Sequence, residues 1–393
     1  MKKGSMWKLS ASLLIPALLL AGCSKSNASE PAVQAVAAEQ AQSIEQQKEL
    51  TVDELYALAK EEGSVTVYSM SSRINSVKES FEAKYPGVSV VVYDMRQSEL
   101  LEKFQREYEA GIRNADIIFV KDTDGSVYNE FVKRGQLAAY NPSDLTKNSP
   151  AQFQSGGFAP YFEMKQIFYN TEVYPASPID SWWDLTRDEY KGKLIIRNPI
   201  ENSETMGLFL SFVSHPDEMA QSYRQEFGKE LELDGTSNAG YEFLKRLAKN
   251  DLIVMTSDTD IVSAVGAPGQ ANPPFGIATS SKMRDAGAAK NLFMDVAWNL
   301  SPRLGVSDPA YLYIADKAKG LHAAQLLIRW MGGEVEGTGA GFKPFHVRGS
   351  WPTRNDVQPV NTPALDTLNL WPLDLDYNYL HQDELRNFWL TVQ

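Results

Sequence analysis

Short apolar runs alternate with amphipathic stretches of helical length along this 393-residue chain, and this alternation limits its fold more than any other feature. Strands are expected at residues 64–69, 88–94 and 115–120, with helices at 51–62, 74–85, 98–110 and 125–134. The pattern restarts with strands at 193–197, 252–255 and 275–278 and helices at 205–214 and 240–250. This alternation predicts α/β architecture with a parallel sheet covered by helices on both faces. The length is sufficient for two such lobes with a ligand site between them.

The first fifty residues predict where the protein works. Three lysines precede the apolar run 11–20, which is too short to span a membrane and ends in Leu-Ala-Gly-Cys at Cys23. This end resembles the lipobox of bacterial lipoproteins, so residues 1–23 are expected to be a signal peptide and Cys23 to carry lipid. An ordinary signal peptide with a chance cysteine is the alternative. Residues 24–50 contain no aromatic side chain and predict a flexible tether. The protein is therefore expected to be exported and lipid-anchored to the cell membrane, facing the extracellular or periplasmic side.

Composition excludes several classes of site. Cys23 is the only cysteine, so an internal disulfide and a cysteine zinc site are excluded, and the four histidines show no HExxH spacing. No Ser-His-Asp or Cys-His arrangement with supporting context is present, so no catalytic residue, metal or cofactor is expected and the chain is not expected to be an enzyme. The formal net charge of −12 argues against a nucleic-acid partner.

Polar side chains gather where the expected strands give way to helices. Hydroxyls, carboxylates and two cations at these turns would converge at the carboxyl ends of the strands, where open α/β sheets bind ligands. Backbone N–H groups at helix starts favour an anion there. The same residue types are also preferred helix caps, so capping alone is the alternative for each cluster. The candidate ligand-binding residues are Ser69, Ser71, Ser72, Arg73, Lys121, Asp122, Thr123, Ser203, Thr205, Ser257, Asp258, Ser280 and Ser281.

Several blocks, in this order and spacing, resemble one family. Residues 169–175 (YNTEVYP), 181–185 (SWWDL) and 190–193 (YKGK) look like the interlobe region of extracellular solute-binding proteins, the receptors of ABC importers. Residues 60–68 and 314–331 also match that family, and the ferric-ion-binding branch is the most similar. The resemblance implies the two-lobed type II periplasmic-binding-protein fold, which closes on its ligand by hinge motion. It implies a first lobe of residues 51–160 plus 297–393 and a second lobe of residues 161–296.

The resemblance also bears on the solute. Iron-binding members carry adjacent tyrosines just after a strand of the second lobe, whereas this chain has Ser280 and Ser281 in the corresponding stretch. Neutral hydroxyls are poor ferric ligands but good hydrogen-bond donors to phosphate, carboxylate or sugar groups. We therefore expect a small polar solute, anionic or phosphorylated rather than neutral, delivered to the permease subunits of an ABC transporter by a monomeric receptor. A ferric-iron receptor, a surface hydrolase and a sensory subunit that reports to a membrane kinase are the alternatives.

The chain beyond residue 332 extends past the matched blocks. Its prolines predict an extended path over the surface, followed by a final helix at residues 382–390.

Overall fold

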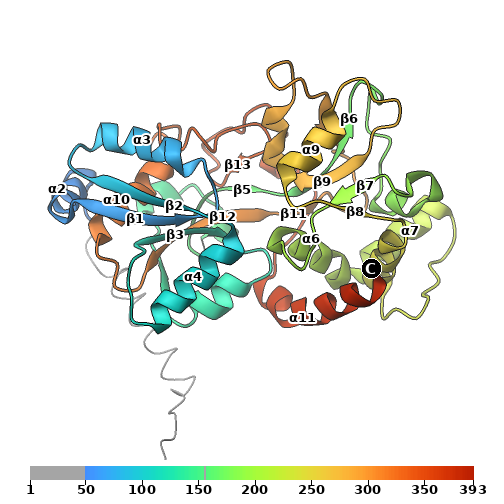
Figure 1. The fold of residues 1–393 in the computed structure, drawn as a ribbon, viewed down its shortest axis with the longest axis horizontal. Helices are drawn as coiled ribbons and strands as arrows, with labels where there is room; N and C mark the ends of the chain where they lie inside the picture. Colours follow the sequence, from blue (N-terminus) through green and yellow to red (C-terminus); the bar gives the residue numbers. More distant parts are fainter. Residues whose placement is uncertain (1–48, 155) are drawn as a thin grey trace, which may run out of the picture.

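The computed structural model describes residues 49–154 and 156–393 (Figure 1). The predictions of a signal peptide, lipidation at Cys23 and a tether up to residue 48 lie outside these residues. Local signals determine the first described helix, α2 (Val52–Glu62): the Thr51 hydroxyl accepts the Glu54 N–H, the Glu54 carboxylate accepts the Thr51 N–H, and Gly63 ends the helix with φ 76°.

The first lobe is built on a seven-stranded sheet. Its strands lie in the order β13-β5-β12-β3-β1-β2, and β4 also pairs with β12. The sheet is mixed rather than purely parallel: β1, β2 and β3 are parallel, whereas β12 returns from the second lobe and runs antiparallel to β3 and β5. The strands are β1 (Ser64–Ser69), β2 (Ser89–Asp94), β3 (Ile117–Lys121), β4 (Leu137–Ala139), β5 (Phe158–Glu163), β12 (Asp308–Ala315) and β13 (Trp351–Pro352).

Helices cover both faces of this sheet, as the sequence predicts. Residues from α2, α3 and α10 share one apolar core with one face of the strands, and residues from α4 and η1 share a second core with the other face. The expected helix at 125–134 is instead the short π-helix η1 (Tyr128–Val132). The remaining helical segments of this lobe are α3 (Ile74–Lys84), α4 (Gln97–Glu109), α5 (Ser143–Thr146), η2 (Ala151–Phe153) and α10 (Leu321–Met331).

The second lobe contains a five-stranded sheet in the order β10-β6-β9-β7-β8. Helix α9 packs on one face, while α6, α7, α8 and η3 enclose a larger aromatic core on the other. The strands are β6 (Lys165–Asn170), β7 (Leu194–Ile196), β8 (Ile253–Val254), β9 (Phe275–Thr279) and β10 (Met294–Val296). The helices are α6 (Ser203–Ser214), α7 (Pro216–Phe227), α8 (Ala239–Ala248), α9 (Asp258–Gly266), η3 (Trp182–Thr186), η4 (Asp188–Tyr190) and η5 (Ser280–Asp285).

The chain crosses between the lobes three times. It leaves the first lobe from β5 into β6, returns from β11 (Gly305–Val306) into β12, and leaves again between β13 and β14 (Leu370–Trp371), past η6 (Leu365–Thr367). Strands β11 and β14 pair with each other. The last helix, α11 (Leu375–Val392), then packs on α6 and α8 of the second lobe (Figure 1).

This packing differs from the expectation that all of residues 297–393 belong to the first lobe. The buried Leu385 and Trp389 join the aromatic core of the second lobe, where the Trp389 ring lies 5.1 Å from the Phe209 ring. Helix α11 also begins seven residues before the expected start at residue 382, because Asp374 caps it by accepting the Tyr377 N–H. The C-terminal segment is thus shared between the lobes.

Candidate functional site at the interlobe junction

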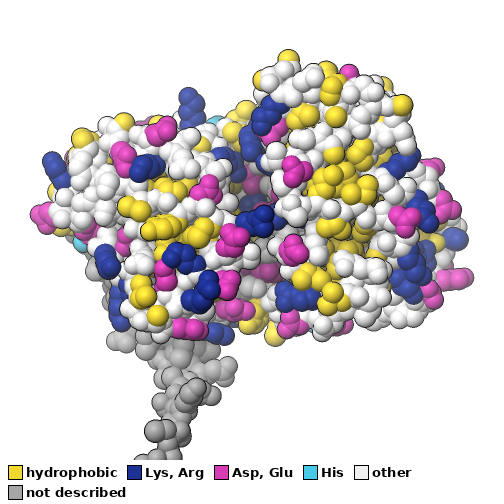
Figure 2. All heavy atoms as spheres, viewed as in Figure 1, with side chains coloured by type: hydrophobic (Ala, Val, Ile, Leu, Met, Phe, Trp, Pro, Cys, Tyr) yellow, Lys and Arg dark blue, Asp and Glu magenta, His cyan; other side chains and the backbone are white. Residues whose placement is uncertain are grey.

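Charged side chains concentrate where the two lobes meet. The ends of β1, β3 and β5 in the first lobe face the start of α6 and the end of β9 in the second, and we call this region the interlobe junction. Figure 2 shows Lys, Arg, Asp and Glu side chains gathered in the hollow between the lobes.

Lys121, the last residue of β3, is the centre of the junction. Its buried Nζ lies 2.8 Å from Glu163, 2.6 Å from Glu204 and 2.8 Å from Asp308. Burial alone would lower the pKa of Lys121, but the three carboxylates raise it well above its ordinary value. The ammonium therefore stays charged and holds together groups from both lobes.

Glu204 forms the ionic bridge between the lobes. Its Oε1 pairs with Lys121 of the first lobe, and its Oε2 lies 2.7 Å from Nζ of the buried Lys165 in the second. Lys165 also pairs with Asp258 at 3.1 Å. Burial would raise the pKa of Glu204, but the two lysines hold it well below its ordinary value. Beside this bridge the Gln97 side chain donates to the Ser203 hydroxyl at 3.1 Å.

Arg73, at the turn after β1, has donor capacity that the protein does not use. Its Nη2 donates to Glu163 at 2.8 Å, and the guanidinium lies 5.0 Å from the centre of the Phe345 ring and 5.5 Å from that of Tyr161. Within residues 49–154 and 156–393, the buried Arg73 Nη1 and the buried Tyr161 hydroxyl have no hydrogen-bond partner. Buried polar groups normally have one, so these two atoms are candidates for contacts with a bound solute.

Two more cations extend from η5 in the second lobe. Burial lowers the pKa of Lys282, and the positive charge of Arg284 lowers it further. Burial also lowers the pKa of Arg284, and the charge of Arg73 adds to that effect. Lys282 donates to the Thr259 hydroxyl at 2.6 Å, and Arg284 donates to the Ser281 hydroxyl at 3.0 Å. Arg284 thus lies near enough to Lys282 and to Arg73 for their charges to repel. We call these three residues the cation cluster.

The structure brings part of the predicted site together. The Thr123 hydroxyl donates a hydrogen bond to Asp308, and a hydrogen bond from Ser281 helps to lower the pKa of Glu163. The predicted residues with side chains at the interlobe junction are Arg73, Lys121, Thr123, Ser203, Asp258 and Ser281.

The other predicted residues form turns, caps or hydrogen bonds to the backbone, or are exposed. Ser69 and Ser71 form a turn with each other, Ser72 is exposed, and Asp122 accepts the N–H groups of Val127 and Tyr128. Capping accounts for two more, because Thr205 bonds the N-cap residue of α6 and Ser257 is the N-cap of α9. The Ser280 hydroxyl donates to the Gly349 carbonyl at 2.6 Å and accepts the Met164 N–H at 3.1 Å.

Sequence reasoning missed most of the charged partners. The junction residues that are not among the sequence candidates are Tyr161, Glu163, Lys165, Glu204, Lys282, Arg284 and Asp308. The positive charges just after Ser281 are a sequence signal for Lys282 and Arg284 only. In the described part of the chain, no group of three or more His, Cys, Asp or Glu side chains could hold a metal ion, and none of the helices there could cross a membrane.

Comparison with known proteins assigns the chain to a family. A family profile described as bacterial extracellular solute-binding protein matches residues 76–368. A search of curated proteins gives no match.

Solved structures share the fold at low identity. Apo ferric ion-binding protein A of Pasteurella haemolytica is 18% identical, with a TM-score of 0.60 over 84% of this chain and 98% of that one. Iron-bound HitA of Pseudomonas aeruginosa is 14% identical, with a TM-score of 0.61 over 84% and 99%. AfuA of Actinobacillus pleuropneumoniae, with fructose-6-phosphate bound, is 17% identical, with a TM-score of 0.60 over 84% and 97%.

The predicted two-lobed α/β architecture and the predicted family are both confirmed by these matches. Proteins of this family are exported, non-enzymatic components of transport that bind small-molecule solutes and work with ABC permeases. The chain belongs to the bacterial extracellular solute-binding proteins and is a solute-binding receptor of the ABC transporter type.

Proposed function

We propose that this receptor captures a small organic anion, of which a phosphorylated sugar is the best example, at the interlobe junction. The observation that carries the proposal is the cation cluster with its unused donors. Arg73 Nη1 and the Tyr161 hydroxyl lie buried without a partner among the described residues. Charge-assisted hydrogen bonds from guanidinium groups are the usual means of holding phosphate or carboxylate oxygens.

Charge argues against ferric iron at the same position. Tyr161 offers one phenol oxygen, but burial raises the pKa of this tyrosine against the opposing charge of Arg73 over its ring, so the phenol stays protonated. A highly charged cation would be repelled by the cation cluster. The solute named for AfuA, fructose-6-phosphate, has the charge and hydroxyls that the junction could satisfy.

Replacing Arg284 with methionine tests the solute class. We expect fructose 6-phosphate to bind the purified protein, and this variant to lose about tenfold or more in affinity because one charge-assisted hydrogen bond contributes about 1.5–3 kcal/mol. Isothermal titration calorimetry measures the change. The matched control is Arg224→Met, which removes a half-exposed surface arginine paired with Glu230 and should leave the affinity unchanged.

Ferric citrate and fructose provide the discriminating comparisons. Heat with ferric citrate and none with any phosphate ester would overturn the proposal in favour of an iron receptor. Equal binding of fructose and fructose 6-phosphate would show that the cation cluster does not select the solute.

We also propose that Cys23 carries the lipid that anchors the receptor. Its position directly after Leu-Ala-Gly at the end of an apolar run supports this assignment. In a bacterial host the Cys23→Ser variant should move from the membrane fraction to the soluble fraction or the medium, as measured by immunoblotting. Retention of the variant in the membrane fraction would contradict the anchor. A membrane-kinase partner requires the same closing receptor and is not favoured by any feature of the junction.

A further inference from the structure

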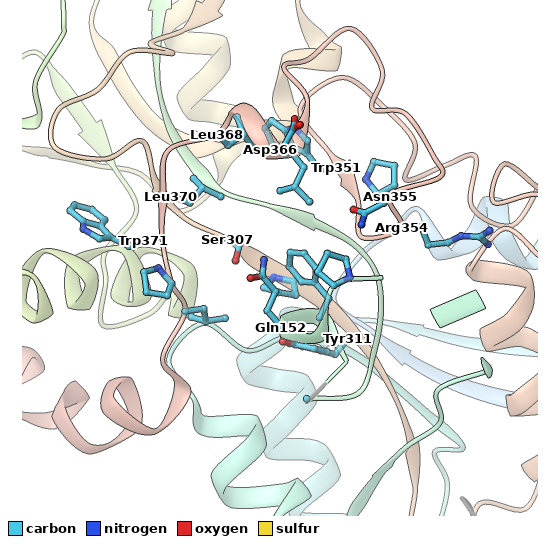
Figure 3. A pocket seen from close by; sticks show the side chains of 18 of the residues that line it. Gln152, Ser307, Tyr311, Trp351, Arg354, Asn355, Asp366, Leu368, Leu370 and Trp371 are labelled. Atoms are coloured by element: carbon cyan, nitrogen blue, oxygen red, sulfur yellow. The ribbon is translucent and has the colours of Figure 1, made fainter. Parts of the chain in front are cut away.

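A cavity lies beside β12, on the face of this strand opposite to Asp308. It has a volume of about 1160 Å³ and is lined by residues from η1, residues 150–153, Gly156, the start of β12 and residues 351–376 (Figure 3). Successive side chains of a strand point to opposite faces. Asp308 therefore pairs with Lys121 at the junction, while Ser307, Pro309 and Tyr311 line the cavity.

The uncharged polar side chains in the lining include Gln152, Ser307, Tyr311 and Asn355. Tyr311 is 2% exposed and Ser307 is 8% exposed, whereas Gln152 and Asn355 lie nearer the solvent. None of these side chains forms a hydrogen bond with another residue in the ranges 49–154 and 156–393. Burial raises the pKa of Tyr311 above its ordinary range, so its hydroxyl remains a neutral donor. The two deep hydroxyls are therefore free to form hydrogen bonds with a ligand in the cavity.

Much of the remaining wall is apolar. Aromatic, proline and leucine side chains contribute to it, and the indole of Trp351 is fully buried beside the cavity. Rings of this kind pack well against the C–H faces of other rings. A ligand for this wall needs a flat apolar face as well as hydroxyls.

The charges around the cavity exclude an anion. Asp366, Asp374 and Asp376 are the acidic lining residues. The one arginine in the lining, Arg354, is occupied by Asp356 and by the carbonyls of Glu334 and Val335. The cavity therefore differs from the cation-rich junction in the charge of the ligand it would take.

We infer that this cavity is a second binding site, for a neutral saccharide whose hydroxyls bond Tyr311, Ser307, Gln152 and Asn355 while its ring lies on the aromatic and proline wall. The inference is independent of the proposed anion site, because no side chain is common to both. Its volume slightly exceeds the usual range of about 300–1,000 Å³ for small-molecule sites, so a disaccharide suits it better than a monosaccharide.

The test is calorimetric titration of the purified protein with maltose, cellobiose, lactose and sucrose. At least one should bind, and the Tyr311→Phe variant should weaken that binding by about fivefold, the loss expected for one neutral hydrogen bond. Combining it with Gln152→Ala should weaken binding further. The matched control is Tyr313→Phe, because Tyr313 lies two residues along the same strand and its buried hydroxyl also lacks a partner among the described residues, but it does not line the cavity.

Three results would overturn the inference. They are no heat with any of the four sugars, equal weakening by Tyr311→Phe and Tyr313→Phe, and displacement of the disaccharide by fructose 6-phosphate. Thermal melting of each variant separates loss of binding from loss of folding. Arg284→Met should leave disaccharide binding unchanged, so failure of the anion proposal and failure of this one give different patterns.

Discussion

Replacing Lys121 with methionine should lower the free energy of unfolding by about 3–5 kcal/mol, because a buried charge that loses its partner is costly. Three carboxylates surround the Lys121 ammonium within 2.8 Å, and methionine would leave them without that cation. Urea unfolding followed by tryptophan fluorescence measures the change. Lys133→Met is the control, since Lys133 pairs with Asp376 on the surface and such pairs contribute about 0–1 kcal/mol.

The difference between wild type and Lys121→Met should also depend on pH. In the wild type the pKa of Glu163 is held well below its ordinary value of 4.5, with burial opposed by Lys121 and Arg73, so its contribution to stability is present above that value and lost in acid. Without the lysine, burial should instead raise the pKa of Glu163 in the folded state, and the pKa of Asp308, which burial already raises to about 7, should rise further. The variant should then lose stability as pH rises, and the difference should widen from pH 4 to pH 8. A constant difference below about 1 kcal/mol would show that the carboxylates are not buried as described.

The second large effect is expected from Gly207→Ala, which should hold the lobes apart. A Cβ at Gly207 of α6 would lie 2.2 Å from Cγ2 and 2.9 Å from the carbonyl oxygen of Thr123 in the first lobe. Overpacking of this kind costs about 1–3 kcal/mol, which disfavours the closed arrangement at least about fivefold. Separation of the lobes relieves the clash, so opening rather than unfolding is the expected response.

Spin labels at Glu79→Cys and Asp260→Cys can measure this opening. Both positions are exposed and lie on different lobes, and Cys23 is the only natural cysteine, so a Cys23→Ser background leaves only the introduced pair. The distance between the labels should increase in Gly207→Ala. It should stay unchanged in Ser211→Ala, which removes a hydroxyl that bonds the Gly207 carbonyl within the same helix. Identical distances in all three proteins would contradict the close approach of α6 to β3.

A structural feature could be predicted from the sequence when the residues that determine it lie close together along the chain. The strand Ser64–Ser69 and the cap at Thr51 could be predicted, because alternation and capping involve residues only a few positions apart. Element order also led to the correct fold class. The direction of β12 could not be predicted, since it depends on the chain returning from the second lobe.

The candidate site was harder to predict from the sequence for the same reason. Arg73 and Lys121 could be selected by their place in the turn after one strand and at the end of another. Their partners could not, because Lys121 and Glu204 are separated by 83 residues and meet only when the lobes are together. The sequence also does not distinguish a side chain that bonds within the protein from one that could contact a solute. The Ser280 hydroxyl bonds the Gly349 carbonyl, while Arg284, four residues later, belongs to the cation cluster.

The three chain crossings restrict how the two lobes can move. Lobes joined by one strand could swivel, twist and slide, but crossings at β5–β6, β11–β12 and β13–β14 leave few degrees of freedom. Pairing of β11 with β14 ties two of these crossings into one joint. Hinge rotation of one lobe about a single axis is then the easiest motion. Each closure should therefore bring Glu204 back to Lys121 in the same register, so the joint itself preserves the geometry of the binding site.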